Sequence, residues 1–475
     1  MPITWVRVLF WSYLFFLVWA YGTISNPADP DLWHRLYLGE ALWKTGHFPL
    51  GDDSSYLADY QNISDHEWGS AVIFYALYQG FGPSAIVILK LIGLAITVIF
   101  LVLAGLRQRP LSPLMAAFYS LVLLALLPSF GSTARCMIFT HIFFALWLFW
   151  FQCERYGRPI PAFWYVLTII IWANLHGGFA IGLAWLLGLG LIEMWYGFNG
   201  RKWLIRFGLC LMATLINPFG WHLWITTVRA LLVTRQGFYE WGPVPWLVID
   251  YPGYKLLLLG TLVAIAVQSF HRKSLVKTDL MVTDILIAFI VLSITSARHA
   301  SIFASVAGAL LPGFFPSEPR LQSIVRPLHR QIYVALSALL FLSPLYAVFF
   351  LPSEKLTLTY PSVAAPVQAV DYLKQQKIRG NLLVPFNYGS YAMWQLRGQM
   401  RVSMDGRYDL VYHPETYRRV ADFFLAKDDW KNLLTTPPPE AILVRVADPV
   451  YPKLKDELGW MEAYRNTTDA VFLPR

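Results

Sequence analysis

Residues 84–106 read SAIVILKLIGLAITVIFLVLAGL, an apolar run in which Lys90 is the only charged side chain. About 20 apolar residues carry a helix across the hydrocarbon core of a bilayer, so this stretch predicts a membrane span. Other segments of the same character bring the expected number of spans to about eleven. The expected spans are 5–24, 84–106, 111–129, 137–152, 161–175, 177–197, 203–226, 253–270, 279–297, 299–315 and 331–351. The apolar segment 69–81 is too short to cross, and we interpret it as an interfacial or re-entrant helix.

The composition of the 475-residue chain also indicates a membrane protein. Hydrophobic residues make up 56% of the chain and charged residues only 14%, against roughly 25% charged residues in ordinary soluble domains. This balance excludes a disordered chain, a coiled coil and a soluble enzyme of this size. The three cysteines, Cys136, Cys153 and Cys210, fall in or beside apolar segments, which excludes a disulfide framework and a CxxC metal site.

Charge divides the chain into two parts. Residues 1–351 hold 22 Lys and Arg and 15 Asp and Glu, whereas the shorter segment 352–475 holds 16 and 14. We therefore expect a transmembrane domain over 1–351 and a small soluble α/β domain over 352–475. Most of the net charge of +9 belongs to the first part, where membrane topology explains a basic excess. The sequence has no basic run with interleaved aromatic residues, so nucleic acid is not an expected partner.

The basic residues also predict which side of the membrane each loop faces, because cytoplasmic loops are enriched in Lys and Arg. With a cytoplasmic N-terminus, the inner side collects 14 of the 22 basic residues of the first part. The expected inner loops, all basic, are 107–110, 153–160, 199–202, 271–278 and 316–330. The loop 25–68 and the C-terminal domain then face outward, and we expect a bacterial inner membrane with these parts in the periplasm.

The first outer loop, 25–68, is rich in acids and aromatic residues, and it holds eight of the 15 acids of the first part. Apolar residues between Leu32 and Trp43 have helical spacing and predict a helix along the membrane surface. Asp29 and Asp31 would lie at the outer end of the first span, where partial desolvation raises the basicity of a carboxylate. The alternative interpretation is a solvated loop that obeys the same charge rule.

Cations and imidazoles follow on the outer ends of several expected spans. They are Arg135, His176, Arg298 and His299. Each alone also fits an interface anchor, because such groups are costly to keep in a membrane without a partner. Together they predict a face that suits an anionic lipid headgroup.

Short motifs in the first loop carry a family resemblance. Asp31-Leu32-Trp33-His34, Asp52-Asp53-Ser54 and His66-Glu67-Trp68, with the order of spans, outer loop and outer C-terminal domain, resemble the GT-C superfamily of membrane glycosyltransferases. The similarity is to its protein O-mannosyltransferase and aminoarabinose-transferase branch.

The resemblance implies a polyprenyl-phosphate sugar as the donor and a glycan, lipid or protein as the acceptor. It also implies an aspartate of the first loop as general base, either Asp31 or Asp29. Here the acids form an Asp-Pro-Asp sequence instead of an adjacent pair, so the resemblance does not assign the base to one of them.

The chemistry of the residues agrees with this implication. Glycosyl transfer from a lipid phosphate needs a base for the acceptor hydroxyl and positive charge or hydrogen-bond donors for the leaving phosphate. Arg135, His176, Arg298 and His299 are the candidates for the phosphate. Candidates for substrate contacts or a divalent cation such as Mg²⁺ or Mn²⁺ are His34, Asp52, Asp53, His66 and Glu67, although their spacing matches no metal-site pattern.

The C-terminal segment alternates helix and strand signals. The expected helices are 366–378, 413–426 and 451–460, and the expected strands are 381–386 and 440–446, followed by a hairpin over 461–475. Two loops that follow strands hold Asn387, Tyr388, Asp405 and Arg407, where ligand-binding loops often lie. Each loop also fits an ordinary turn. We expect this domain to recognise the acceptor, cover the membrane cavity or bind a protein partner.

The leading hypothesis is therefore an inverting membrane glycosyltransferase that acts on the outer face. The alternatives are a non-catalytic membrane scaffold and a polysaccharide polymerase or ligase of envelope glycan assembly. An ion-coupled transporter is disfavoured, because such proteins need polar residues deep inside their spans and these spans hold few.

Overall fold

The computed structural model divides the chain into two compact units. Unit 1 comprises Met1–Asn26, Val87–Pro218 and Thr234–Thr357, and unit 2 comprises Pro27–Ile86, Phe219–Val233 and Leu358–Arg475. The residues described are 3–48, 53–60, 64–130, 135–232, 241–248, 250–271, 276–315, 342, 349, 356–427, 429–457 and 459–475. The expected span 331–351 and the expected inner loop 316–330 lie outside them, apart from residues 342 and 349.

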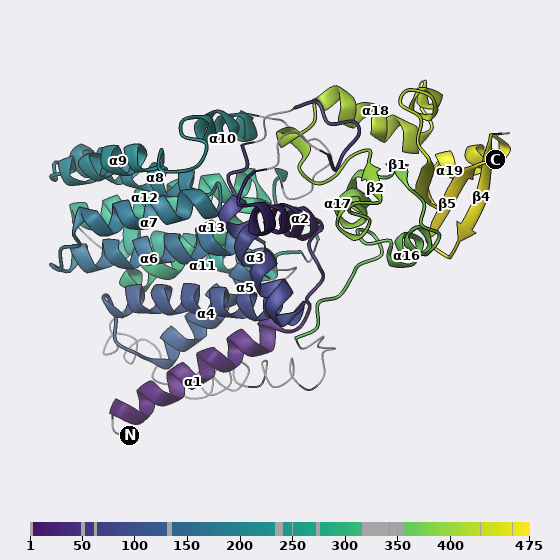
Figure 1. Cartoon of the computed structure of the whole chain (residues 1–475). Helices are drawn as coiled ribbons and strands as arrows, with labels where there is room; N and C mark the ends of the chain where they lie inside the picture. Colours follow the sequence, from purple (N-terminus) through teal and green to yellow (C-terminus); the bar gives the residue numbers. More distant parts are fainter. Residues whose placement is uncertain are drawn as a thin grey trace. The chain divides into compact units, whose positions relative to one another are not determined.

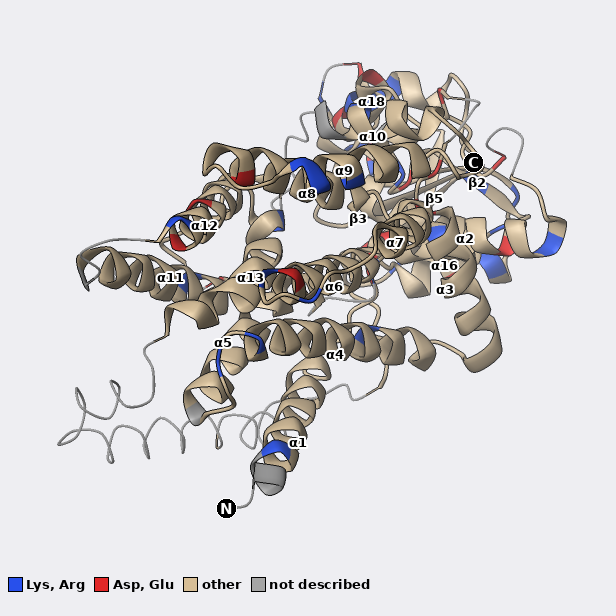
Figure 2. Ribbon diagram, turned by 90° about the vertical axis from the view of Figure 1, so that its left-hand side faces the viewer, with Lys and Arg blue, Asp and Glu red and all other residues tan. Residues whose placement is uncertain are grey.

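Unit 1 consists of helices (Figure 1). They are α1 (Ile3–Gly22), most of α4 (Ser84–Leu106), α5 (Pro113–Phe130), α6 (Met137–Arg155), α7 (Ala162–Leu175), α8 (Phe179–Trp195), α9 (Arg201–Ala213), α11 (Pro252–His271), α12 (Lys277–Thr295), the 3-10 turn η2 (Ala297–His299), α13 (Ala300–Leu310) and the 3-10 turn η3 (Leu311–Phe314). Long stretches of these helices carry no Lys, Arg, Asp or Glu (Figure 2). By length and composition, α4, α6, α11 and α12 can each cross a membrane, and α1, α5, α7 and α8 contain shorter apolar stretches.

Helix α5 lies at the centre of the unit 1 packing, in contact with α1, α11 and α13. Its Tyr119 hydroxyl donates to the carbonyl oxygens of Leu101, at 2.9 Å, and Gly308, at 3.1 Å. Every residue of α13 is buried, and most of them are small, which lets neighbouring backbones approach closely. The expected spans from 5–24 to 177–197 all appear as helices with ends shifted by a few residues at most.

The prediction of one span over 203–226 was wrong. The chain forms α9, which ends at Ala213, and a separate helix α10 (His222–Leu232), which belongs to unit 2. Pro218 and Gly220 lie between the two helices, and the φ of Gly220 is +55°. A proline lacks the N–H that continues a helix, and a left-handed glycine turns the chain away from the helical path. The expected span 299–315 likewise contains only the 11-residue helix α13, with η3 starting at Leu311-Pro312.

Unit 2 begins with two helices from the first loop, α2 (Pro30–Thr45) and α3 (Trp68–Phe81). Helix α2 starts after Asp29 as N-cap, has Pro30 in its first turn and is followed by Gly46 as C-cap, whose φ of +70° suits a glycine. These helices confirm the predicted helical segments around 32–43 and 69–81. They pack on each other, and α2 packs on α17 (Phe386–Gln395) of the C-terminal segment.

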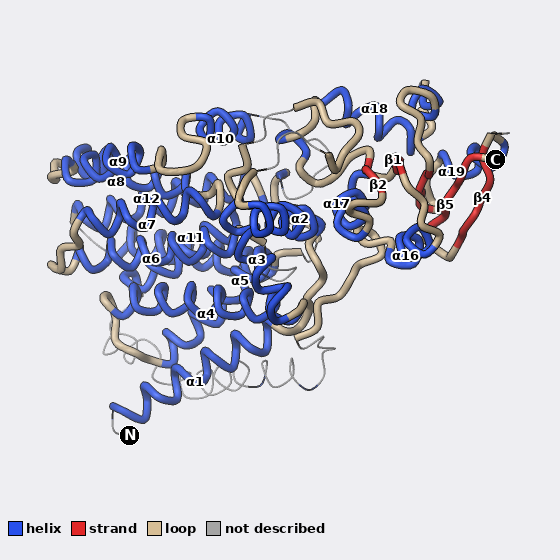
Figure 3. The backbone as a smooth tube through the Cα atoms, viewed as in Figure 1, coloured by secondary structure: helices blue, strands red, loops and turns tan. Residues whose placement is uncertain are grey.

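The C-terminal part of unit 2 is a five-stranded mixed sheet with helices (Figure 3). The strands are β1 (Gly380–Leu383), β2 (Met400–Val402), β3 (Ala441–Arg445), β4 (Trp460–Arg465) and β5 (Asp469–Pro474), in the order β2-β1-β3-β5-β4. Strand β1 pairs in parallel with β2 and β3, whereas β5 runs antiparallel to β3 and β4. The expected strands and the closing hairpin are confirmed.

The remaining elements cover the sheet. They are α16 (Val367–Gln375), α17, the 3-10 turn η4 (Tyr408–Leu410), α18 (Pro414–Leu425), the 3-10 turn η5 (Trp430–Leu434) and α19 (Val450–Asp456). Ile442 and Val444 of β3 pack with Phe423 of α18 and Leu454 of α19 in one buried cluster. The segment that starts at Phe386 was expected to be a loop and is the first turn of α17. Pro385, which precedes this helix, supplies the backbone acceptor for the Tyr388 and Gly389 amides.

Candidate functional site

The two candidate bases occupy different environments at the start of α2. Asp29 is only 4% exposed, and its Oδ1 accepts the Asp31 backbone N–H at 2.9 Å, which caps the helix. The side chain of Asp31 is 57% exposed. A carboxylate at a helix N-terminus is stabilised by the helix dipole and the first-turn amides. Asp29 therefore caps helix α2, while the carboxylate of Asp31 is exposed to solvent.

His34 lies one turn after Asp31 in the buried part of unit 2. Its Nδ1 is 4.0 Å from the Asp31 carboxylate, and its side chain is 2% exposed. Neither ring nitrogen has a hydrogen-bond partner among the described residues. Burial, and then the charge of Arg35, lower the pKa of His34 to about 3. The imidazole is therefore neutral at physiological pH, with one N–H to donate.

A turn of the C-terminal segment lies directly against Asp31. A Cβ atom built on Gly406 would be 2.6 Å from Asp31 Oδ1 and 3.4 Å from His34 Nδ1. The Gly406 N–H donates to Ser390 Oγ of α17 at 2.9 Å. A side chain at this position would require the Asp31 carboxylate to shift, because the Cβ atom and Oδ1 would be closer than van der Waals contact. Residues far apart in the sequence thus surround Asp31.

Asp405 and Arg407 fix this turn as an ion pair. The Arg407 guanidinium donates to Asp405 through Nε, at 2.8 Å, and through Nη2, at 2.5 Å, and the Tyr412 hydroxyl donates to the same carboxylate at 2.7 Å. Burial alone would raise the pKa of Asp405, but the charge and hydrogen bonds of Arg407 lower it to about 2. Arg407 also donates to Ser54 Oγ at 2.9 Å, which ties the turn to the first loop.

Arg35 forms a buried charge cluster that the sequence analysis missed. Its guanidinium pairs with the carboxylates of Asp65 and Glu67, and the three side chains are 6%, 5% and 14% exposed. The cluster joins α2 to the segment that leads into α3. Arg35 is the only arginine in a loop that holds eight acids. That excess of acids could have indicated from the sequence that Arg35 forms a buried ion pair.

The candidates for a divalent cation are not gathered in one place. Glu67 pairs with Arg35, and His66 Nε2 lies 3.8 Å from Glu67 Oε1. Asp53 is exposed, and Asp52 lies outside the described residues. Across the described ranges, three or more His, Cys, Asp or Glu nowhere come close enough together to hold a metal ion.

The expected phosphate contacts all belong to unit 1. Arg135 directly precedes the N-cap of α6. His176 is 6% exposed and connects α7 to α8. Its Nδ1 accepts the Gly178 N–H at 2.9 Å and lies 2.7 Å from Thr140 Oγ1 of α6. The neutral imidazole therefore carries its hydrogen on Nε2.

Arg298 and His299 lie just before α13. The Arg298 guanidinium lies 4.7 Å from the centre of the Trp241 ring, and His299 is the N-cap of α13. In the first turn of α13, Ser301 Oγ lies 3.4 Å from His141 Nε2 of α6. The starts of α6 and α13 therefore lie at the same end of unit 1, and the four predicted phosphate contacts flank the helix termini there.

Lys90, near the start of α4, is buried and donates hydrogen bonds to the segment that follows α1. It is 1% exposed and donates to the Ser25 carbonyl oxygen at 3.0 Å and to Asn26 Oδ1 at 2.5 Å. These bonds hold the segment in which α1 leads into the first loop.

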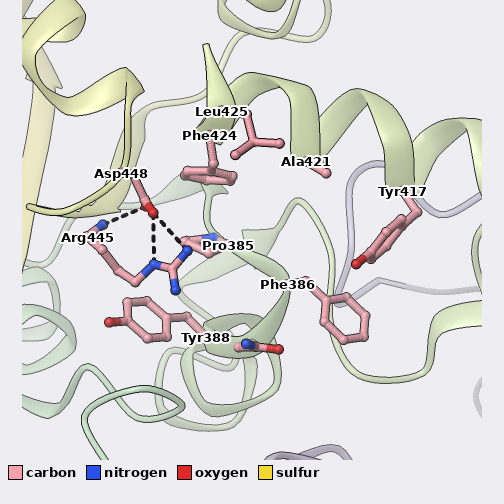
Figure 4. A pocket seen from close by; sticks show the side chains of 10 residues that line it. Pro385, Phe386, Tyr388, Tyr417, Ala421, Phe424, Leu425, Arg445 and Asp448 are labelled. Carbon is pink, nitrogen blue, oxygen red and sulfur yellow. Dashed lines mark hydrogen bonds and ion pairs between the residues drawn. The ribbon is translucent and has the colours of Figure 1, made fainter. Parts of the chain in front are cut away.

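The two residues proposed in the loop after β1 lie in the first turn of α17. Asn387 is exposed, whereas Tyr388 is buried, and its hydroxyl donates to Asp469 Oδ1 at 2.7 Å. Both line a pocket (Figure 4) of which Asp405 and Arg407 are not part.

The sequence matches no protein-family model and no curated protein, whereas the fold matches solved structures. The oligosaccharyltransferase AglB from Archaeoglobus fulgidus, in complex with an inhibitory peptide and a dolichol-phosphate, is 12% identical with a TM-score of 0.61, over 92% of this chain and 69% of AglB.

Two other transferases have the same fold. Apo ArnT from Cupriavidus metallidurans is 14% identical with a TM-score of 0.60, over 99% of this chain and 98% of ArnT, and ArnT bound to undecaprenyl phosphate gives 15% and 0.56. The arabinofuranosyltransferase AftD from Mycobacteria is 14% identical with a TM-score of 0.53, over 100% of this chain and 40% of AftD. Over most of its length, this integral membrane protein is structurally similar to GT-C glycosyltransferases.

Proposed function

We propose that this protein is a membrane glycosyltransferase that moves a sugar from a polyprenyl-phosphate donor to an acceptor hydroxyl, with Asp31 as general base. The observation that carries the proposal is the exposed Asp31 carboxylate at the start of α2, beside the buried His34 and the backbone of Gly406. The fold supports the donor class, since ArnT binds undecaprenyl phosphate and AglB binds a dolichol-phosphate.

Asp31 is a better base than Asp29 for two physical reasons. A base must come within about 2.6–3.2 Å of the proton that it removes, and Asp31 is exposed while Asp29 is buried. In addition, Oδ1 of Asp29 already accepts the Asp31 backbone N–H. Asp29 is therefore a positioning residue, which fixes the helix terminus that carries Asp31.

The proposed reaction is one displacement. The Asp31 carboxylate takes the proton of the acceptor hydroxyl while the acceptor oxygen forms a bond to the anomeric carbon. The bond from that carbon to the phosphate oxygen breaks, and the electron pair leaves with the polyprenyl phosphate. Attack opposite to the leaving group inverts the anomeric centre. A single base is sufficient, because no glycosyl-enzyme intermediate forms.

The other residues have supporting roles in this proposal. Positive charge and hydrogen-bond donors stabilise the leaving phosphate, which is the role that we assign to Arg135, His176, Arg298 and His299. His34 is neutral and can donate a hydrogen bond without competing for the proton. By the basic inner loops, the N-terminus is cytoplasmic and residues 352–475 are extracytoplasmic.

The test is a transfer assay with the purified protein in lipid nanodiscs. Radiolabelled polyprenyl-phosphate sugars and polyprenyl-diphosphate glycans are offered with candidate acceptors. We expect turnover of a monophosphate donor, and a loss of about 10²- to 10⁴-fold in the Asp31→Asn variant. The control variant Asp456→Asn makes the same chemical change at an exposed position of α19 and should keep the full rate.

Two results would overturn the proposal. Full activity of Asp31→Asn would remove Asp31 as the base. Turnover of diphosphate-linked glycans alone would identify a polymerase or ligase instead.

A further inference from the structure

The C-terminal part of unit 2 contains a cavity at the carboxyl ends of β1 and β3. Its volume is about 230 Å³, and it lies between the first turn of α17, the last turns of α18 and the residues that follow β3. In the strand order β2-β1-β3, the chain passes from β1 to β2 on one side of β1 and then returns to form β3 on the other side of β1. Such a reversal point, at the carboxyl ends of parallel strands, is where ligands bind in open α/β sheets.

One side of the cavity is aromatic (Figure 4). Phe386 and Tyr417 pack edge to face, with ring centres 5.4 Å apart, on the side away from Arg445. The ring of Phe424, which is 6% exposed, lies nearer to Asp448 (Figure 4). Leu425 also lines the cavity and is 45% exposed. The partly exposed rings of Phe386 and Tyr417 and the side chain of Leu425 therefore offer an apolar surface to a ligand.

The opposite side holds a polar group with no net charge. Arg445 Nε donates to Asp448 Oδ1 at 2.9 Å, and the Arg445 backbone N–H donates to Oδ2 at 3.0 Å. Asp448 is 4% exposed, whereas the Arg445 side chain is 44% exposed. One edge of the planar guanidinium thus faces Asp448, and a third nitrogen is turned away from it (Figure 4). The exposed amide of Asn387 adds a further donor and acceptor.

We infer that this cavity binds one neutral sugar ring. The two faces of a pyranose present aliphatic C–H groups, which pack on aromatic rings, while its edge presents adjacent hydroxyls. A planar guanidinium and an amide can donate to and accept from such a pair of hydroxyls. The volume is below the roughly 300–1,000 Å³ of pockets that enclose drug-sized ligands, so one ring fits and a longer chain extends outward. That this sugar belongs to the acceptor glycan rests on the proposed function.

The same residues disfavour the other ligand classes. An apolar peptide side chain would cover Arg445 and Asn387 without replacing their hydrogen bonds to water, and such unpaired polar groups are costly. A nucleotide or another anion would meet Asp448, which already neutralises Arg445, and the sequence has no glycine-rich phosphate-binding motif.

The test is ligand binding to the full-length protein in nanodiscs, without donor. The probes are methyl glycosides of neutral hexoses and N-acetylhexosamines, with glucuronate as an anionic probe and a short phenylalanine-containing peptide as an apolar one. Saturation-transfer NMR reports which ring protons touch the protein. We expect signals from the C–H protons of the neutral glycosides and none from the other two probes.

Two variants and one control locate the binding. Ala421→Phe fills the cavity from α18 and should abolish the signal, and Asn387→Ala, at an exposed position, should weaken affinity roughly two- to tenfold. Arg419→Ala, at an exposed position of the same helix, should bind as the wild type does. Because Asn387→Ala does not alter the core, it remains informative if Ala421→Phe fails to fold.

The outcomes separate this inference from the proposed function. Unchanged binding in both cavity variants, or binding of the peptide or glucuronate in place of the neutral glycosides, would overturn the sugar site. In the Asp31→Asn protein, glycoside binding should persist although transfer is lost. A failed transfer assay therefore leaves the binding result standing, and a failed binding assay leaves the role of Asp31 open to its own test.

Discussion

Replacing Arg35 with Met should destabilise unit 2 more than any change at an exposed ion pair of the same helix. The variant leaves the carboxylates of Asp65 and Glu67, 5% and 14% exposed, without their cation. Removing one partner of a buried ion pair costs about 3–5 kcal/mol, because the remaining charge is poorly solvated. For a unit of roughly 150–250 residues, each kcal/mol shifts the unfolding midpoint by about 2–4 °C. We therefore expect the midpoint to fall by about 6–20 °C.

The matched control is Lys44→Met. Lys44 Nζ pairs with Glu40 Oε1 at 2.7 Å, but the lysine side chain is 62% exposed. Such surface pairs contribute about 0–1 kcal/mol, so this variant should lie within a few degrees of the wild type. Both variants lose one positive charge from α2, which removes net charge as an explanation for a difference between them.

The assay is tryptophan fluorescence during heating, in nanodiscs of fixed composition. A compensated variant, Arg35→Met with Asp65→Asn and Glu67→Gln, should recover much of the loss, because no buried charge remains unpaired. If Arg35→Met unfolds at the same temperature as Lys44→Met, or if the compensated variant recovers nothing, the cluster is not the buried ion pair that we describe.

Three further predictions concern the start of α2 and its surroundings. Asp29→Ala should cost about 1 kcal/mol in unfolding free energy through loss of the cap, whereas Asp29→Asn should keep it; equal melting curves for the two would contradict the capping role. Gly406→Ala places a Cβ 2.6 Å from Asp31 Oδ1, so the transfer rate should fall several-fold with little change in the melting curve, and an unchanged rate would contradict the close approach. The pKa of His34 is lowered to about 3 in the folded protein, against about 6.5 in the unfolded chain. The unfolded chain therefore takes up this proton first, and stability should fall as the pH drops from about 6.5 toward 3; melting curves of His34→Gln should lack this part of the pH dependence.

Local pattern predicted much of the fold. The helix over 84–106 appears with the expected ends, since a single segment of that length and apolar character can satisfy its backbone hydrogen bonds in a bilayer only as a helix. The break within 203–226 was missed because hydropathy averages over a window and gave little weight to Pro218 and Gly220. The helix that starts at Phe386 was missed because its Asn-Tyr-Gly sequence also fits a turn, and packing on α2 decides between the two.

The candidate site was less predictable. Asp29 and Asp31 could be named from the sequence, but only the exposure of each carboxylate separates a cap from an accessible base. The ion pair of Arg35 with Asp65 spans 30 residues, and the approach of Gly406 to Asp31 depends on how distant segments pack. The sequence shows which residue types could form such contacts, but it does not show which residue contacts which.

The discontinuous composition of unit 2 has a consequence for the biogenesis of the protein. Ser55 Oγ donates to the carbonyl oxygen of Ser403, a residue 348 positions later in the chain. At synthesis rates of about 5–20 residues per second, the second residue emerges roughly 20–70 s after the first. During that interval the first loop lacks the C-terminal strands and helices of unit 2, and Trp33 lacks its ring contacts with Tyr360 and Tyr391. Unit 2 can therefore complete its fold only after nearly the whole chain has been synthesised.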